Sequence, residues 1–252
     1  MSAINAVELE IIRNALVAAA EEMSVTVWRT SRSPVVRDIL DYSTAVFDAE
    51  GGSTAQAARM PVHLNSMARC LLDILADHIA IEEWREGDII ITNDPYSGGQ
   101  HLPDILTFKP VFLNGRRIAI AGVLVHHLDV GGGAPGSYHA EATEIFQEGF
   151  RIPPLKIDEA GIRNQAIVKL LLRNSREPEK VGGDFTSQLA ALDIGVESLK
   201  AIGRRYGADR LAEASRRIQD QSERAMRAAI RAMPNGTHEF EDFVDDDGIE
   251  RD

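Results

Sequence analysis

The chain has 252 residues, of which 27 are Lys or Arg and 39 are Asp or Glu, so its formal net charge is −12. This balance argues against a nucleic-acid partner and against binding to an anionic membrane surface. No apolar run reaches the length of a membrane span, and the polar segment Met1–Glu10 has no signal-peptide pattern. The single cysteine, Cys70, excludes an internal disulfide and lies in an apolar helical pattern, so we expect a buried thiol in a cytoplasmic protein.

The N-terminal part of the chain predicts a long helix followed by a hairpin. Apolar residues recur at helical spacing over residues 6–30, with Asn5 placed to cap the helix and Ser31–Pro34 to end it. Apolar and polar residues then alternate on both sides of a Gly-Gly turn in residues 43–57. This alternation is typical of two half-buried strands.

Two loops rich in Gly carry most of the candidate chemistry. The first, Asn93–Asp104, follows a helix and a buried strand that we expect within residues 63–91. The second, His126–Gly133, comes after residues 106–125, which predict a hairpin with an Asn-Gly turn. A hairpin returns its two ends to one edge of the sheet, so the two loops should be neighbours. Their carboxylates and imidazoles are ligands that a divalent metal uses.

Each loop also has a simpler interpretation. A His-x-x-Asp pattern occurs in many capped turns and exposed loops that bind nothing. Two such clusters at the two ends of one predicted hairpin favour a metal site, but the residues alone leave both interpretations open.

The second half of the chain is helical in pattern from Gly161 to Met233, and its apolar stripe suggests packing or an oligomer surface rather than catalysis. Residues 237–244 then alternate like a strand, and residues 245–248 predict a turn. We therefore expect an α+β fold with an N-terminal helix, a mixed β-sheet carrying metal-binding loops, and a helical C-terminal half. Its expected regions are residues 1–157 with the metal site, residues 158–236 with the helices, and residues 237–252 with a strand and the start of a further region.

Long motifs are spread along the whole chain in addition to the two loops. They are Leu9–Leu16, Arg37–Ser43, Phe47-Asp48, Pro61–Leu64, Thr143–Gly149, Arg151–Pro154, Phe240–Phe243 and Asp245–Gly248. Together with the loops, this set resembles the hydantoinase B/oxoprolinase family. That family includes the B subunits of ATP-dependent hydantoinases, part of 5-oxoprolinase, lactamases of the caprolactam type and a subunit of acetone carboxylase.

The resemblance implies a metal held by four side chains, Asp41, His101, Asp104 and His126. Two carboxylates and two imidazoles form a neutral shell for a divalent cation, and mixed oxygen and nitrogen donors suit Zn, Mn or Fe better than Mg or Ca. The residues alone also allow other roles. Asp41 could cap a turn, Asp104 could end a strand, and His126 could be a hydrogen-bonded core histidine.

The resemblance further implies a hydrolase that opens the C–N bond of a cyclic amide, such as a hydantoin, 5-oxoproline or a lactam, in an ATP-dependent complex. A hydantoinase A-type subunit would bind ATP and phosphorylate the amide oxygen, and the chain contains no Gly-x-x-x-x-Gly-Lys-Ser/Thr loop of its own. We expect His127 and Asp129 to act in catalysis, by proton transfer or by orienting an imidazole. Loop capping and turn formation are the alternative for both residues.

Two other functions agree with the same sequence. One is a subunit of an ATP-dependent ketone carboxylase of the acetone type, in which the metal stabilises an enolate. The other is a non-catalytic assembly subunit or a truncated remnant. Because the chain resembles the N-terminal part of longer family members, a separately encoded C-terminal part is a further expected partner.

Overall fold

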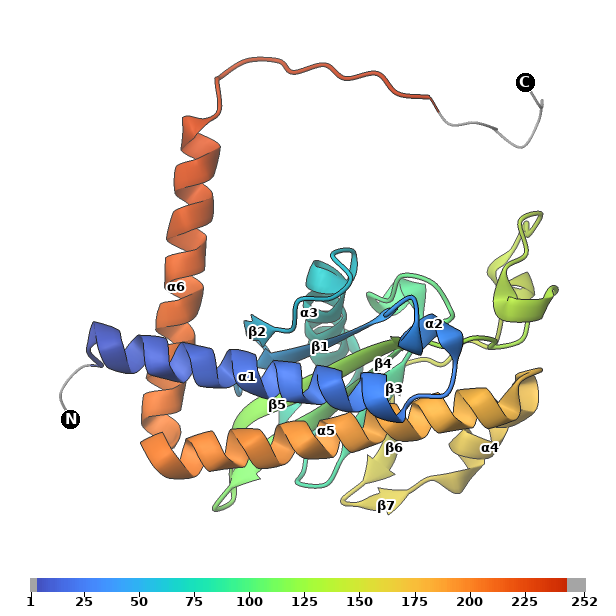
Figure 1. Ribbon diagram of the computed structural model, residues 1–252, viewed down its shortest axis with the longest axis horizontal. Coiled ribbons are helices and arrows are strands. Elements are labelled where there is room, and N and C mark those ends of the chain that lie inside the picture. The colour runs from blue at the N-terminus through green and yellow to red at the C-terminus, as the bar shows by residue number, and fades with distance from the viewer. Residues whose placement is uncertain (1–3, 244–252) are drawn as a thin grey trace. The chain divides into compact units, whose positions relative to one another are not determined.

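The computed structural model describes residues 4–243 and has the predicted α+β fold. Helices α1 (Ala6–Thr30) and α5 (Pro178–Tyr206) run side by side over one face of a seven-stranded sheet, and α3 (His63–Asp73) covers the other face (Figure 1). The remaining α-helices are α2 (Pro34–Arg37), α4 (Gln165–Asn174) and α6 (Ala208–Ala232). Short helical turns lie at Ile74–His78, Ile81–Glu83, Pro95–Ser97, Pro135–Ser137 and Ile145–Gln147.

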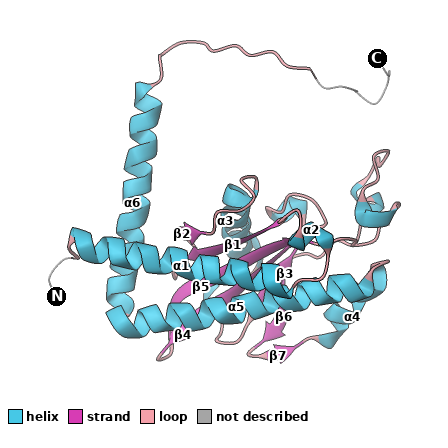
Figure 2. Cartoon of the chain, viewed as in Figure 1, coloured by secondary structure: helices cyan, strands magenta, loops and turns pink. Residues whose placement is uncertain are grey.

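The sheet is antiparallel at every described strand pair, in the order β2-β1-β5-β4-β3-β6-β7 (Figure 2). The prediction of a mixed sheet is therefore wrong. Parallel neighbours need long crossover connections, whereas hairpins join β1 to β2, β4 to β5 and β6 to β7. The strands are β1 (Tyr42–Phe47), β2 (Ser53–Gln56), β3 (Ile89–Thr92), β4 (Asp104–Leu113), β5 (Arg116–His126), β6 (Leu155–Glu159) and β7 (Ile162–Arg163).

The long N-terminal helix begins where its sequence predicts. The side chain of Asn5 accepts a hydrogen bond from the backbone N–H of Glu8, which otherwise has no partner in the first turn. The buried face of α1 includes Leu9, Ile12 and Leu16, which are spaced to lie on one side of a helix. This face joins the core between the helices and the sheet.

The β4–β5 hairpin is the element that matters most for the site. Its turn residues Asn114 and Gly115 both have positive φ, 53° and 76°, as a type I′ turn requires. The register pairs Leu113 with Arg116 at the turn and Asp104 with His126 at the far end. The predicted hairpin is thus confirmed, and it joins the two Gly-rich loops at one edge of the sheet.

The sheet separates two apolar clusters. Residues from α1, α5 and one sheet face form the larger cluster, whereas Met67, Cys70 and Leu71 of α3 pack on Phe47 and Phe108 from the other face. Cys70 is buried as predicted, and burial together with the charges of Asp73 and Asp94 raises the pKa of its thiol to about 12. It is therefore an unreactive thiol.

The chain divides into two compact units, Met1–Gln219 and Asp220–Asp252. In the second unit, residues 237–243 form neither helix nor strand, and Phe240 and Phe243 are 89% and 82% exposed. The strand expected at residues 237–244 is thus not formed in its described part, because no described segment pairs with it. Val244 and the turn expected at residues 245–248 lie outside the described residues. No helix between residues 4 and 243 has both the length and the apolar character needed to cross a membrane.

Candidate metal centre

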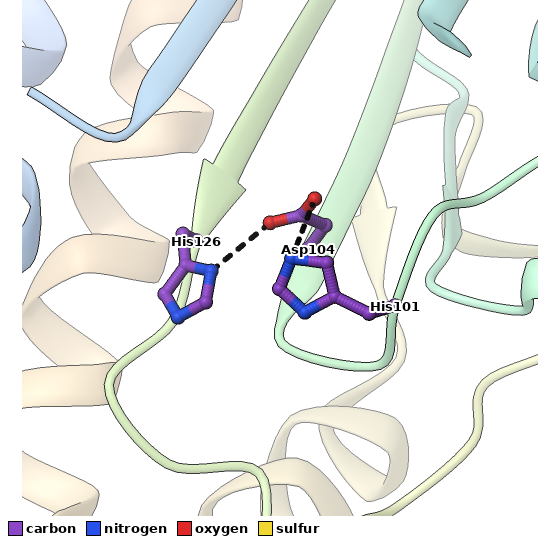
Figure 3. A group of neighbouring side chains, drawn as sticks. All are labelled: His101, Asp104 and His126. Atoms are coloured by element: carbon purple, nitrogen blue, oxygen red, sulfur yellow. Dashed lines mark hydrogen bonds and ion pairs between the residues drawn. The ribbon is translucent and has the colours of Figure 1, made fainter. Parts of the chain in front are cut away.

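Three of the expected ligands meet at the open end of the β4–β5 hairpin (Figure 3). Asp104 is the first residue of β4, and His126, the last residue of β5, stands directly opposite it. His101 lies in the loop just before β4. Asp104 Oδ1 is 3.2 Å from His126 Nδ1, and Asp104 Oδ2 is 3.2 Å from His101 Nε2.

Burial of the cluster is uneven. Asp104 and His126 are almost fully buried, whereas the side chain of His101 is 41% exposed. Among residues 4–243, Asp104 Oδ2 has no hydrogen-bond donor, although His101 Nε2 lies 3.2 Å away. Figure 3 shows both imidazoles directed at this one carboxylate. The cluster therefore has a buried core and one side open to solvent.

The fourth expected ligand, Asp41, lies at the same place. It precedes β1, which pairs with β5, and its backbone carbonyl accepts a hydrogen bond from the N–H of His126. Its carboxylate Oδ2 is 3.6 Å from His126 Nδ1. The preceding residue, Leu40, has a φ of 62°, a left-handed conformation that costs a branched side chain about 1–2 kcal/mol. The structure thus brings all four expected ligands together and holds Asp41 on a strained turn.

His63 also reaches the cluster, although the sequence analysis did not select it. It is the first residue of α3, and its Nε2 lies 3.6 Å from Asp41 Oδ1 and 3.7 Å from Asp104 Oδ2. Its Nδ1 is 3.0 Å from Ser43 Oγ, which orients the ring. The motif Pro61–Leu64 was the signal that could have identified it, but nothing in that motif shows that α3 begins beside the β4–β5 hairpin.

The electrostatics of the cluster favour an ionised carboxylate among imidazoles. Burial alone would raise the pKa of Asp104, but contacts with His101 and His126 outweigh burial and hold this pKa below its usual value. The Asp104 carboxylate in turn raises the pKa of His101. Burial lowers the pKa of His63, so its imidazole favours the neutral form, which is the form that binds metals.

Within residues 4–243, no hydrogen bond or ion pair joins the side chain of either expected catalytic residue to this cluster. Successive side chains at a strand end point to opposite faces, so His127 faces α5 while His126 faces the cluster. His127 is fully buried, and its Nε2 is 3.2 Å from Oε1 of Gln188 in α5. Burial lowers the pKa of His127 to about 4, although the hydrogen bond to Gln188 opposes the shift. The structure thus places His127 at the junction between α5 and the sheet.

Asp129 organises the loop that follows β5. Its carboxylate accepts hydrogen bonds from the N–H groups of Gly131, Gly136 and Arg176, and Oδ2 is 3.1 Å from Arg176 Nη1. Burial alone would raise the pKa of Asp129, but these contacts lower it below its usual value. Its observed contacts are those of a residue that shapes a loop.

A cavity of about 380 Å³ opens beside the exposed ring of His101. Tyr138 and Glu148 line it, and the hydroxyl of Tyr138 is 3.4 Å from Nε2 of His126. One nitrogen of His126 therefore faces the carboxylates, and the other faces a tyrosine that borders open space. A small molecule in this cavity would lie next to the His/Asp cluster.

Comparison with known proteins identifies the family of the chain. The model of the hydantoinase B/oxoprolinase family matches residues 5–251. The chain belongs to this family. It is 35% identical to the caprolactamase subunit beta of Pseudomonas jessenii over 251 residues, a stretch that covers 98% of this chain and 42% of that protein.

Solved structures of related proteins share the fold. The crystal structure of the ATP-dependent caprolactamase from Pseudomonas jessenii matches with a TM-score of 0.84 at 35% identity, over 93% of this chain and 40% of that one. A nucleotide-free acetone carboxylase structure matches with a TM-score of 0.81 at 20% identity, over 89% and 30% of the two chains, and this likeness concerns the fold alone. The chain therefore spans less than half the length of each of these matched proteins.

The donor atoms of this family member fit a divalent metal. Two ligands bound about 2.1 Å from one ion at tetrahedral angles lie roughly 3.4 Å apart. The distances from the Asp41 and Asp104 oxygens to the nearest imidazole nitrogens are 3.2–3.7 Å. Asp104 Oδ2 is a buried acceptor without a hydrogen-bond donor among the described residues, and a bound cation would satisfy it. Mixed carboxylate and imidazole donors suit Zn, Mn or Fe.

Proposed function

We propose that this chain supplies the metal-dependent site of an ATP-dependent cyclic amidohydrolase and works in a complex with an ATP-binding subunit. The observation that carries the proposal is the meeting of His101, Asp104 and His126, whose donor atoms lie within 4.8 Å of one another, with Asp41 Oδ2 3.6 Å from His126 Nδ1. Family membership supports the chemistry, since the similar protein from Pseudomonas jessenii is named for a cyclic amide and described as ATP-dependent.

The four side chains would hold the metal, with His63 beside them as a further donor. When bound, a divalent metal supplies Lewis acidity and lowers the pKa of a coordinated water toward about 7. The residues around it keep the donors in place: Ser43 orients His63, and Tyr138 contacts the outer nitrogen of His126. Because His101 is half exposed next to the cavity, a substrate would approach the cluster from this side.

A division of labour explains why ATP is needed. A free amide is a poor electrophile, and phosphorylation of its oxygen makes the ring carbon more open to attack. After water adds to that carbon, the C–N bond breaks and the ring nitrogen leaves as a protonated amine. The acyl phosphate that remains is then hydrolysed by a second water to a carboxylate and phosphate. We propose that the partner subunit performs the phosphorylation and that the cluster described above serves the attack of water on the activated ring. His127 and Asp129 would support this reaction indirectly, His127 by holding the end of β5 and Asp129 by shaping the loop beside the cavity.

Elemental analysis tests the proposal directly. The purified wild type is expected to carry about one transition metal per chain, and His101→Ala and Asp104→Ala should carry far less. His238→Ala is a matched control, because His238 is exposed and contacts only the carbonyl of Pro234 among the described residues. Affinity should fall below about pH 6, where protons compete for the imidazoles. Equal metal content in all four proteins would contradict the site.

A further inference from the structure

A second cavity, of about 700 Å³, is lined in part by Phe146 and Gly149–Arg151, the neighbours of a residue that lines the His101 cavity. Glu148 lines the cavity beside His101, whereas Arg151, three residues later, lines the second one together with Arg173 and Arg176. None of the residues that line it is acidic. This is a local excess of positive charge in a chain whose net charge is −12.

The guanidinium of Arg151 is held by two aromatic rings. Its carbon Cζ lies 5.7 Å from the ring centroid of Tyr96 and 5.7 Å from that of Phe146. Both rings are largely exposed, at 77% and 71%, so they add little to the core. Cation–π contacts of this kind restrict the guanidinium before any ligand arrives, which lowers the entropy cost of binding.

The three arginines differ in how far their hydrogen-bonding capacity is used. Arg176 is committed to Asp129 and to the carbonyls of Gly131, Gly132 and Ala134, so its role is to hold the loop. Arg151 has one ion pair, from Nε to Asp94 at 3.7 Å, and within residues 4–243 no hydrogen bond is found at its Nη1 or Nη2. In the same part of the chain, no hydrogen bond or ion pair is found at the guanidinium of Arg173.

We propose that this cavity binds the oxyanion of a small molecule, a carboxylate or a phosphate, through Arg151 and Arg173. A guanidinium presents a planar pair of N–H donors that matches either group. Arg176 lines the same space, but its charge is paired with Asp129, so the proposed contacts are those of Arg151 and Arg173. The site is distinct from the His/Asp cluster, and the inference does not depend on a bound metal.

Calorimetric titration of the metal-free full chain tests the site, with inorganic phosphate in one arm and 5-oxoproline, a carboxylate, in the other, at constant ionic strength. Saturable binding of at least one of the two ligands is expected, and the ligand that binds more tightly shows whether the site prefers a phosphate or a carboxylate. Arg151→Gln and Arg173→Gln should each weaken binding about tenfold, as expected for the loss of one charge-assisted contact. Arg151→Lys should bind more tightly than Arg151→Gln but less tightly than wild type, because lysine keeps the positive charge but lacks the planar pair of N–H donors.

Two further variants separate a binding role from a structural one. Tyr96→Leu and Phe146→Leu keep every charge and should weaken binding roughly two- to fivefold, by freeing the guanidinium. Arg116→Gln removes an exposed arginine that pairs with Asp209 and should leave binding unchanged. Arg173 is exposed, so Arg173→Gln should fold even if a substitution at position 151 does not. Absence of saturable binding in both arms, or equal affinity in wild type, Arg151→Gln and Arg173→Gln, would overturn the proposal.

Discussion

Asp104 and His126 are cross-strand partners in the β4–β5 ladder, and their side chains meet at 3.2 Å on the face of the sheet that α3 covers. Their separation is therefore set by the register of the hairpin. A slip of one residue would turn His126 to the opposite face and bring His127 toward the cluster. The turn at Asn114 and Gly115, at the other end of the hairpin, is one feature of the chain that fixes this register.

Gly115→Val should destabilise the protein without weakening its metal site. A Cβ at this position would meet no atom within 4 Å, so the cost comes from the φ of 76° alone and should be about 1–2 kcal/mol. The ladder from Val111 to Asp104 is otherwise unchanged, so metal affinity should stay within about twofold of wild type, a difference of less than roughly 0.5 kcal/mol. Chemical denaturation and metal titration measure the two effects, and Gly115→Asn is the control, because Asn tolerates positive φ.

His127→Phe should change how stability depends on pH. The pKa of His127 is about 4 in the folded protein and near 6.5 when unfolded, so its neutral form stabilises the fold above pH 6.5. As the pH falls from 6.5 to 4, the unfolded chain takes up a proton that the folded chain does not, and stability drops by about 1.4 kcal/mol per unit for this one group.

Denaturation midpoints of wild type and His127→Phe should therefore diverge in slope between pH 6.5 and 4, with the wild type falling more steeply. The constant offset from the lost Gln188 contact does not affect this comparison. Parallel slopes would show that His127 takes up a proton as readily in the folded protein as in the unfolded chain. That result would reopen the direct proton-transfer role expected from the sequence.

Asp129→Asn should loosen the loop after β5 rather than abolish metal binding. The substitution removes the charge that pairs with Arg176 and at least one of the backbone contacts, and it should cost about 2 kcal/mol. Amide hydrogen exchange in residues 129–137 should increase. Asp209→Asn is the matched control, because its pair with Arg116 is exposed and should be worth less than about 1 kcal/mol. Metal loss as severe as in Asp104→Ala would instead place Asp129 in the metal site.

The assembled complex should hydrolyse a cyclic amide and should not need bicarbonate. It can be assayed with caprolactam, hydantoins and 5-oxoproline in the presence of ATP, and separately with acetone-like ketones and labelled bicarbonate. His126→Ala should abolish product formation but spare phosphorylation by the partner, because the cluster acts after ATP has been used. Label fixed into an acid-stable product, without turnover of any cyclic amide, would replace the hydrolase by a carboxylase.

Local sequence determined the elements around the site. The cap at Asn5, the Asn114-Gly115 turn and the apolar pattern of β4 and β5 depend on residues close together in the chain, so the hairpin and the meeting of its two loops could be predicted. Asp41 was found from the family resemblance rather than from its spacing, because it lies sixty or more residues from His101, Asp104 and His126. Its contact with His126 requires β1 to pair with β5.

Only the tertiary structure decided which neighbouring residues share the site. His126 and His127 are adjacent in sequence, and the pleat of β5 sends one to the carboxylates and the other to Gln188 in α5. His63 enters the cluster because α3 packs on the same face of the sheet as Asp104, a placement set by the burial of Met67, Cys70 and Leu71. The antiparallel pairing of the described strands likewise depends on contacts between segments that are distant in the sequence. Such long-range pairings depend on which apolar faces bury each other best, and no local pattern in the chain encodes that choice.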